Sequence, residues 1–158
     1  MITVRPAQPG DGGALLRMTQ ELSKTHFPMS DDVVAENFEA ALFQPDPIIG
    51  AFIVLVDGAA AGSAVWHRSF STNKGREVMY LEDIAVLPEF RRMGVAKLLL
   101  REICKLAIAK GYPKVFWLAM EWNEGALALY RSIGAGVEKA NCYCWIEGQA
   151  MQEFAVST

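Results

Sequence analysis

The sequence predicts an α/β fold in which one mixed β-sheet carries helices on both of its faces. Short apolar segments alternate with longer segments whose apolar residues recur every three or four positions. The dipeptide Asp57-Gly58 separates two apolar segments and predicts a β-hairpin. A chain of 158 residues is long enough for one hydrophobic core. We therefore expect a single domain over residues 1–158.

The N-terminal third predicts a strand and two helices. The segment ITVRPA has the composition of a strand. From Asp11 onward, apolar residues recur at helical spacing and predict the first helix. The second helix is expected to have Ser30 or Asp31 as its N-cap, because either side chain can accept a backbone N–H, and to stop at Pro45.

The middle of the chain predicts three strands and the longest helix. The hairpin occupies residues 48–70, and the strand VMYLEDIAVL follows it and ends at Pro88. A helix begins after the hexapeptide RRMGVA and is expected to end at Gly111. The apolar face of this helix is Val95, Leu98, Leu99, Ile103, Leu106 and Ala107.

The C-terminal part predicts a strand, a helix and a last strand. These are KVFWLAM, a helix from about Asn123 to Gly134, and CYCWIE. The expected element order is therefore β-α-α-β-β-β-α-β-α-β.

The composition is typical of a soluble protein. A formal net charge of −3 provides no electrostatic basis for general nucleic-acid binding. Apolar runs such as IIGAFIVLV have about half the length of a membrane-spanning helix. The opening residues lack the apolar region of a signal peptide. We expect a cytoplasmic protein that binds neither nucleic acid nor a membrane.

The cysteines are expected to be reduced. There are three, Cys104, Cys142 and Cys144, and an odd number does not fit a disulfide framework. The spacing of Cys142 and Cys144 is not that of a metal site, so no metal is predicted. Cys104 falls on the apolar stripe of the long helix, where we expect it to pack. His26 and His67 have no partner motif and are interpreted as surface or cleft-rim residues.

The hexapeptide RRMGVA, residues 91–96, has features of an anion-binding helix start. The N–H groups of a first helical turn lack intrahelical partners, and the helix dipole is positive there. Gly94 lets the backbone approach a bulky anion, and the arginines attract it. Taken alone, an ordinary helix start remains the simpler interpretation.

The strand before the hexapeptide carries Glu82 and Asp83 within an apolar run. Strand alternation predicts that they project from opposite faces of the sheet. An ionised carboxylate among apolar groups is costly unless it is paired, hydrated or used. Further along, Asn123 is placed to cap a helix that carries Tyr130 two turns later, where a core tyrosine is the usual interpretation.

Together, YLEDIAVLPEFRRMGVAKLLL and WNEGALALYRSIGA resemble the GNAT superfamily of acetyl-CoA-dependent N-acetyltransferases. RRMGVA matches that superfamily's signature Q/R-x-x-G-x-G/A. YLED, the V-x-P-E-Y/F-R segment and EWN ahead of LY-x-x-x-GA are most similar to the diamine (spermidine/spermine) and thialysine acetyltransferases. The resemblance implies a mixed, mostly antiparallel, twisted sheet of about six to seven strands with about four helices. It also implies that the fourth and fifth strands splay apart.

The resemblance implies a binding site for acetyl-CoA. The pantetheine arm would lie between the splayed strands, the pyrophosphate would meet the N–H groups of residues 92–97, and Arg91 would anchor the turn. The expected cofactor-binding residues are Ile84, Ala85, Val86, Arg91, Arg92, Met93, Gly94, Val95, Ala96, Lys97, Asn123, Ala126 and Tyr130.

The resemblance also implies two catalytic residues, Glu82 and Tyr130. An alkylammonium group has a pKa of about 10 and must lose a proton before it attacks a thioester. Glu82 would take that proton directly or through water, Asp83 would help to hold the cation, and Tyr130 would protonate the departing thiolate. The expected substrate-binding residues are Glu82, Asp83, Phe116, Trp117 and Leu118.

Two departures from the diamine pattern bear on the acceptor. Lys74 lies near the place where the diamine enzymes carry an aromatic residue, and Glu138 is the one acid in the segment GVEKANCYCW. Both changes leave a smaller amine, such as thialysine or a lysine-like amino acid, at least as plausible as a polyamine. The alternatives are an enzyme that acetylates a protein N-terminus or lysine, and a non-catalytic acetyl-CoA-binding module. Because many members of this superfamily form dimers, we also expect a homodimer.

Overall fold

A five-stranded sheet in the order β1-β2-β3-β4-β5 organises the computed structural model, which describes residues 1–138 and 148–156. Its strands are β1 (Ile2–Pro6), β2 (Ile49–Val56), β3 (Ala59–Ser71), β4 (Arg76–Val86) and β5 (Val115–Phe116). The first four are antiparallel neighbours, and β5 runs parallel to β4. The predicted α/β class with a mixed, mostly antiparallel sheet is confirmed. The last predicted strand, CYCWIE, lies outside the described residues.

The helices of the described segments are α1 (Gly12–Ser23), α2 (Ala35–Phe43), α3 (Val95–Ala109), α4 (Glu124–Ser132) and α5 (Gly148–Val156), with a short 3-10 helix η1 (Pro88–Phe90). The chain forms two compact units, one of residues 1–120 and one that begins at Glu121 and contains α4 and α5. None of the described helices has the length and apolarity needed to cross a bilayer.

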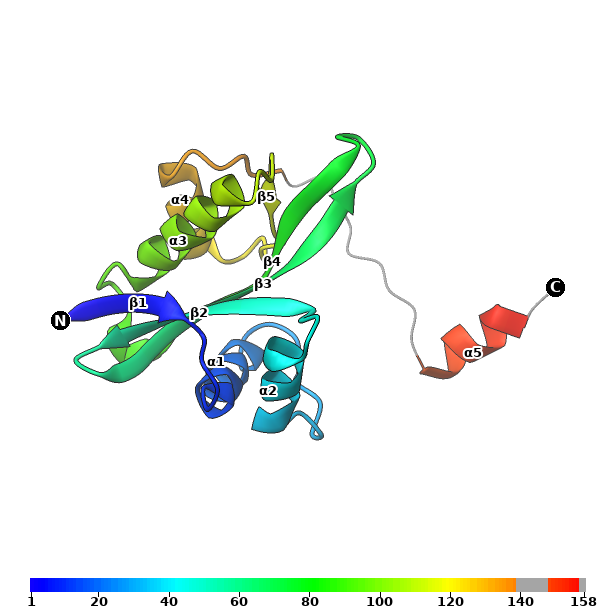
Figure 1. The fold of residues 1–158 in the computed structure, drawn as a ribbon, viewed down its shortest axis with the longest axis horizontal. Helices are drawn as coiled ribbons and strands as arrows, with labels where there is room; N and C mark the ends of the chain where they lie inside the picture. Colours follow the sequence, from blue (N-terminus) through cyan, green and yellow to red (C-terminus); the bar gives the residue numbers. More distant parts are fainter. Residues whose placement is uncertain (139–147, 157–158) are drawn as a thin grey trace. The chain divides into compact units, whose positions relative to one another are not determined.

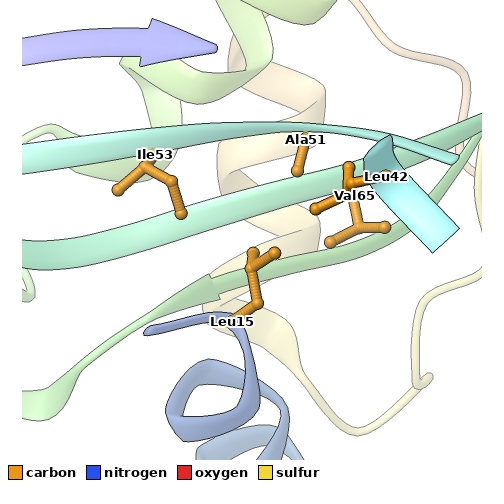
Figure 2. Close-up of a cluster of buried hydrophobic side chains, with 5 residues drawn as sticks. All are labelled: Leu15, Leu42, Ala51, Ile53 and Val65. Atoms are coloured by element: carbon orange, nitrogen blue, oxygen red, sulfur yellow. The ribbon is translucent and has the colours of Figure 1, made fainter. Parts of the chain in front are cut away.

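In the first unit, α1 and α2 cover one face of the sheet and α3 covers the other (Figure 1). Leu15 projects from α1 toward the sheet (Figure 2). Burial of one such side chain stabilises the fold by about 1.5–3 kcal/mol. Leu15 belongs to a cluster of buried side chains that fixes α1 and α2 against β2 and β3. The buried members of this cluster are Leu15, Leu42, Ala51, Ile53 and Val65.

The opposite face of the sheet packs against the apolar stripe of α3. Its buried residues are Val95, Leu99, Leu100, Ile103 and Ala107. Gly111 ends the helix in a left-handed conformation, with φ at 70°, and the N–H of Tyr112 donates to the carbonyl of Ala107 at 2.9 Å. The predicted helix and its end are thus confirmed. Cys104 is exposed rather than packed, because it follows Ile103 at the margin of the stripe.

The second helix begins later than the sequence predicts. Its N-cap is Val34, whose N–H donates to the side chain of Asn37 at 2.7 Å, rather than Ser30 or Asp31. The Ser30 hydroxyl instead donates to the Asp32 carboxylate, a local bond that competes with helix formation. The end of α2 at Phe43, two residues before proline, agrees with the prediction.

The predicted hairpin joins β2 and β3. Asp57 and Gly58 both have positive φ, 49° and 85°, as a type I′ turn requires. Further along β3, Gly62 permits a close approach of β4 and α3. A Cβ at this position would lie 2.7 Å from the carbonyl oxygen of Ala85 and 2.8 Å from Cγ1 of Val95. The absence of a side chain here brings the start of α3 against the C-terminal end of β4.

Candidate active site

Strand β4 contains one extra residue at Glu82. Val65 of β3 pairs with Asp83, and the next residue, Trp66, pairs with Leu81, so Glu82 has no counterpart on β3. This is a β-bulge, which bends a strand and redirects the side chains beside it.

The bulge places Glu82 and Asp83 on the same face of the sheet. Asp83 pairs with Val65, whose side chain belongs to the core beneath α1, and residues directly opposite each other project from the same face. His67, two residues beyond Val65, shares that face, and its Nε2 lies 3.5 Å from Oε2 of Glu82. The prediction that alternation separates the two acids is wrong, because it assumed a strand without a bulge.

Asp83 lies in an environment that disfavours its charged form. Burial raises the pKa of its carboxyl group above the usual range, and the neighbouring charge of Glu82 raises it further. A charge on His26, which follows α1, acts in the opposite direction. Both histidines therefore lie near the acidic pair. Sequence reasoning missed this arrangement because it arises only from the packing of α1 and β3 around β4.

Replacing Asp83 by asparagine should stabilise the fold at neutral pH. A carboxyl group with a raised pKa in the folded state costs stability once the pH exceeds its unfolded pKa of about 4. Asparagine removes that cost, so we expect Tm at pH 7 to rise, by about 2–4 °C for each kcal/mol of cost removed. The difference should vanish below about pH 4, where the wild-type carboxyl group is protonated in both states.

Calorimetric scans between pH 3 and 8 would measure this. Glu77→Gln, which removes an exposed acid from the same strand, is the control. A Tm advantage of Asp83→Asn that grows toward low pH would contradict the assignment.

One edge of β4 is left open beside the acidic pair. β5 pairs with β4 only at Met79 and Tyr80, and no other described strand pairs with that edge. This short pairing agrees with the prediction that the fourth and fifth strands diverge. The N–H of Leu87 donates to β3 at 3.0 Å, so Ile84 and Val86, which alternate with it, direct their main-chain groups toward the open edge. The main-chain groups of Ala85 face β3 instead.

The predicted strand KVFWLAM is much shorter than expected. It forms pairs only at Val115 and Phe116, because its partner β4 bulges soon afterwards. The Phe116 ring packs edge-on against Tyr80, with ring centroids 4.9 Å apart. Trp117 is half-buried and Leu118 is 59% exposed. Of the three predicted substrate-binding residues on this segment, only Phe116 lies on a strand.

The hexapeptide forms a tight turn before α3. Arg92 and Gly94 both adopt left-handed backbone conformations, with φ of 66° and 81°. Gly94 is the N-cap of α3, and no side chain caps the helix there. The first intrahelical bond runs from the N–H of Leu98 to the carbonyl of Gly94 at 3.0 Å. The N–H groups of the first turn therefore remain available, as a pyrophosphate site requires.

Arg91 holds this turn against its surroundings. Its Nη2 donates to Oε1 of Glu21 on α1 at 2.8 Å, and its Nε donates to the carbonyl of Val86 at 3.3 Å. These contacts agree with the prediction that Arg91 anchors the turn. Arg92 and Lys97 are exposed and leave positive charge at the same helix start.

Gly94→Ala is expected to weaken coenzyme A binding about tenfold or more. A side chain in the left-handed region costs about 1–2 kcal/mol, and relief of that strain would move the N–H groups of the turn. Gly75→Ala is a matched control, because Gly75 also has positive φ (62°) and an added Cβ would meet nothing within 4 Å at either position. Titration calorimetry should show weaker binding for Gly94→Ala alone, although both variants lose stability. Equal affinities would contradict a role for this turn.

The second unit carries the remaining predicted residues. Asn123 caps α4, and its Oδ1 accepts the N–H of Ala126 at 3.2 Å, as the sequence predicts for a cap. Tyr130 is buried on α4, and burial raises the pKa of its hydroxyl group above the usual value. The hydroxyl thus stays protonated at neutral pH and can act as a proton donor. The catalytic and cofactor-binding roles of these residues stay predictions.

Comparison with known proteins defines the class of protein. The model of the acetyltransferase (GNAT) family matches residues 15–135. The chain therefore belongs to the GNAT family and is an acyltransferase.

Named relatives include enzymes that act on small amines. Thialysine N-epsilon-acetyltransferase from Bos taurus is 31% identical, over 98% of this chain and 97% of that protein. L-ornithine N5-acetyltransferase from Arabidopsis thaliana is 30% identical, over 84% of this chain and 62% of that protein.

Solved structures share the fold. An integron cassette protein from V. cholerae superimposes with a TM-score of 0.78 at 21% identity, covering 99% of this chain and 98% of the other. The aminoglycoside N-acetyltransferase AAC(6')-Iy, solved in complex with CoA, superimposes with a TM-score of 0.74 at 22% identity, covering 94% of this chain and 95% of the other.

Proposed function

We propose that this chain transfers an acetyl group from acetyl-CoA to a small primary amine, such as thialysine, ornithine or a lysine-like amino acid. The observation that carries the proposal is the bulge of β4, which groups Glu82 and Asp83 on one face. A cationic amine is attracted to such a pair, and one carboxylate can then accept its proton.

The proposed reaction is direct attack of the amine on the thioester. Glu82 removes a proton from the ammonium group, while Asp83 holds the cation in place. The free amine forms a bond to the carbonyl carbon, and the outward N–H of Val86 stabilises the negative charge that develops on the carbonyl oxygen. The C–S bond then breaks, and Tyr130 protonates the thiolate. The step needs no acyl-enzyme, so the cysteines have no part in it.

Acetyl-CoA as the donor is supported by the family and by the turn before α3. The left-handed backbone at Gly94, the open N–H groups of the first turn and the nearby Arg92 and Lys97 suit a pyrophosphate. The main-chain groups of Ile84 on the open edge of β4 suit an amide group of a pantetheine arm.

A small amine is supported over a polyamine by charge. Beside the two acids lie His26 and His67, each of which would repel a polycation when protonated. Lys74 adds a further positive charge on the β3–β4 turn. An amino acid carries its own carboxylate, so it suits a site with mixed charges. A homodimer and a cytoplasmic location remain predictions.

A thiol-release assay with acetyl-CoA tests the proposal. We expect the highest kcat/KM for thialysine, ornithine or lysine, with lower values for putrescine and spermidine. Release with polyamines alone would contradict the preference for a smaller amine. Release with peptides alone would identify a protein acetyltransferase, and acetyl-CoA binding without release from any amine would identify a binding module.

A further inference from the structure

His67 makes two contacts that together define where its proton lies. Its Nδ1 is 2.9 Å from the carbonyl oxygen of Arg68. A carbonyl oxygen can only accept a hydrogen bond, so Nδ1 carries the hydrogen. In the neutral ring, Nε2 is then the acceptor, with its lone pair exposed. Nε2 is the atom that lies 3.5 Å from Oε2 of Glu82.

The His67 ring is held at this position by aromatic packing. His67 and Tyr80 are directly paired across β3 and β4, with ring centroids 5.0 Å apart. Tyr80 in turn packs against Phe116. The side chains of His67 and Glu82 are 35% and 55% exposed, so water reaches both. The ring therefore offers a proton on Glu82 a path to water in addition to direct exchange.

A lone pair facing a carboxylate oxygen is favourable only when a proton lies between the two atoms. With Nδ1 already protonated, the Glu82 and His67 side chains can share one further proton between Oε2 and Nε2. They gain a hydrogen bond whenever Glu82 has accepted a proton, and a 3.5 Å separation requires only a small movement to reach the usual range of about 2.6–3.2 Å.

We propose that His67 takes the proton that Glu82 removes from the amine and passes it to solvent. In the first transfer the amine N–H bond breaks, its electron pair stays on nitrogen and the proton binds Oε2 of Glu82. In the second, the proton moves from Oε2 to Nε2 of His67, which restores the carboxylate. Nε2 then releases the proton to water. His67 is thus a positioning residue that acts through Glu82, and the inference rests on the proposed function.

Imidazole suits this task because it accepts and releases protons near neutral pH. The charged and titratable groups next to the ring are Glu82, Tyr80 and the neighbouring Arg68, which pairs with Asp46 at 3.6 Å. Asp83 lies near Glu82, and His26 lies near Asp83. The Nδ1 of His26 is likewise bonded locally, to the Leu22 carbonyl at 3.2 Å and the Thr25 hydroxyl at 3.0 Å.

The test compares His67→Gln with the wild-type protein in the thiol-release assay with the best amine. We expect His67→Gln to lower kcat about 100-fold, the lower end of the range for acid–base groups, with the Kd for coenzyme A unchanged. Added imidazole should restore kcat in His67→Gln in a concentration-dependent way, and should leave the wild-type kcat unchanged. Wild-type turnover in His67→Gln, or a loss that imidazole leaves unchanged, would overturn the relay.

A second measurement does not depend on turnover. Long-range proton–nitrogen correlation spectra of the wild-type protein should show the Nδ1–H tautomer for neutral His67, and the Nε2–H tautomer would overturn the inference. A wild-type protein that releases no thiol with any amine would instead contradict the proposed function. The two failures are thereby distinguished.

Discussion

Replacing Tyr130 by phenylalanine is expected to lower kcat by about 10²–10⁴-fold, the usual contribution of a general acid. Phenylalanine fills the same buried space on α4 but has no proton to give to the departing thiolate. The Kd for coenzyme A should therefore stay nearly the same. Thiol release under saturating substrates, together with calorimetric titration of coenzyme A, would measure both quantities.

Tyr112→Phe provides the matched control for this variant. It removes a tyrosine hydroxyl from the segment after α3, outside the predicted site, and should leave kcat unchanged. If Tyr130→Phe turned over as fast as the wild-type enzyme, Tyr130 would be excluded as the general acid.

Replacing Glu82 by glutamine is expected to lower kcat/KM at pH 7 by a similar factor of about 10²–10⁴. Glutamine keeps the shape of the side chain but cannot accept the proton of the ammonium group. The variant would depend on the small fraction of amine that is already neutral. Its kcat/KM should rise about tenfold for each pH unit, up to the amine pKa of about 10.

The matched control here is Glu77→Gln, an exposed acid near the start of the same strand. It should retain the wild-type pH profile. A Glu82→Gln variant with that same profile would show that the base is another group.

The predictions that succeeded rest on local rules. Asp57-Gly58 specifies a hairpin through its positive φ angles, Gly111 ends α3 in the left-handed region, and Asn123 caps α4 with its own side chain. Each of these outcomes depends on residues within a few positions along the chain, so the sequence alone suffices.

Some of the errors arose where distant segments decide the outcome, and others within a few residues along the chain. The bulge at Glu82 depends on how β3 and β4 pair, and the contact of His67 with Glu82 depends on that register. The hydrogen bond from the Ser30 hydroxyl to the Asp32 carboxylate lies within a turn, and α2 begins after that turn rather than at Ser30 or Asp31. Helix α5 was not predicted, although Gln149 and Glu153 stand at the spacing of a helical pair and form a bond of 2.6 Å.

Because of the bulge, the placement of both acids on one face also depends on the number of residues in β4. One residue more on β4 than on β3 lets two adjacent carboxylates share a face, so deleting a single position here would change the chemistry of that face without changing any residue type. An alignment of relatives that opens a one-residue gap at this strand would therefore match acids that point in different directions. Any redesign of the proposed acceptor site must preserve the length of β4 before it alters side chains.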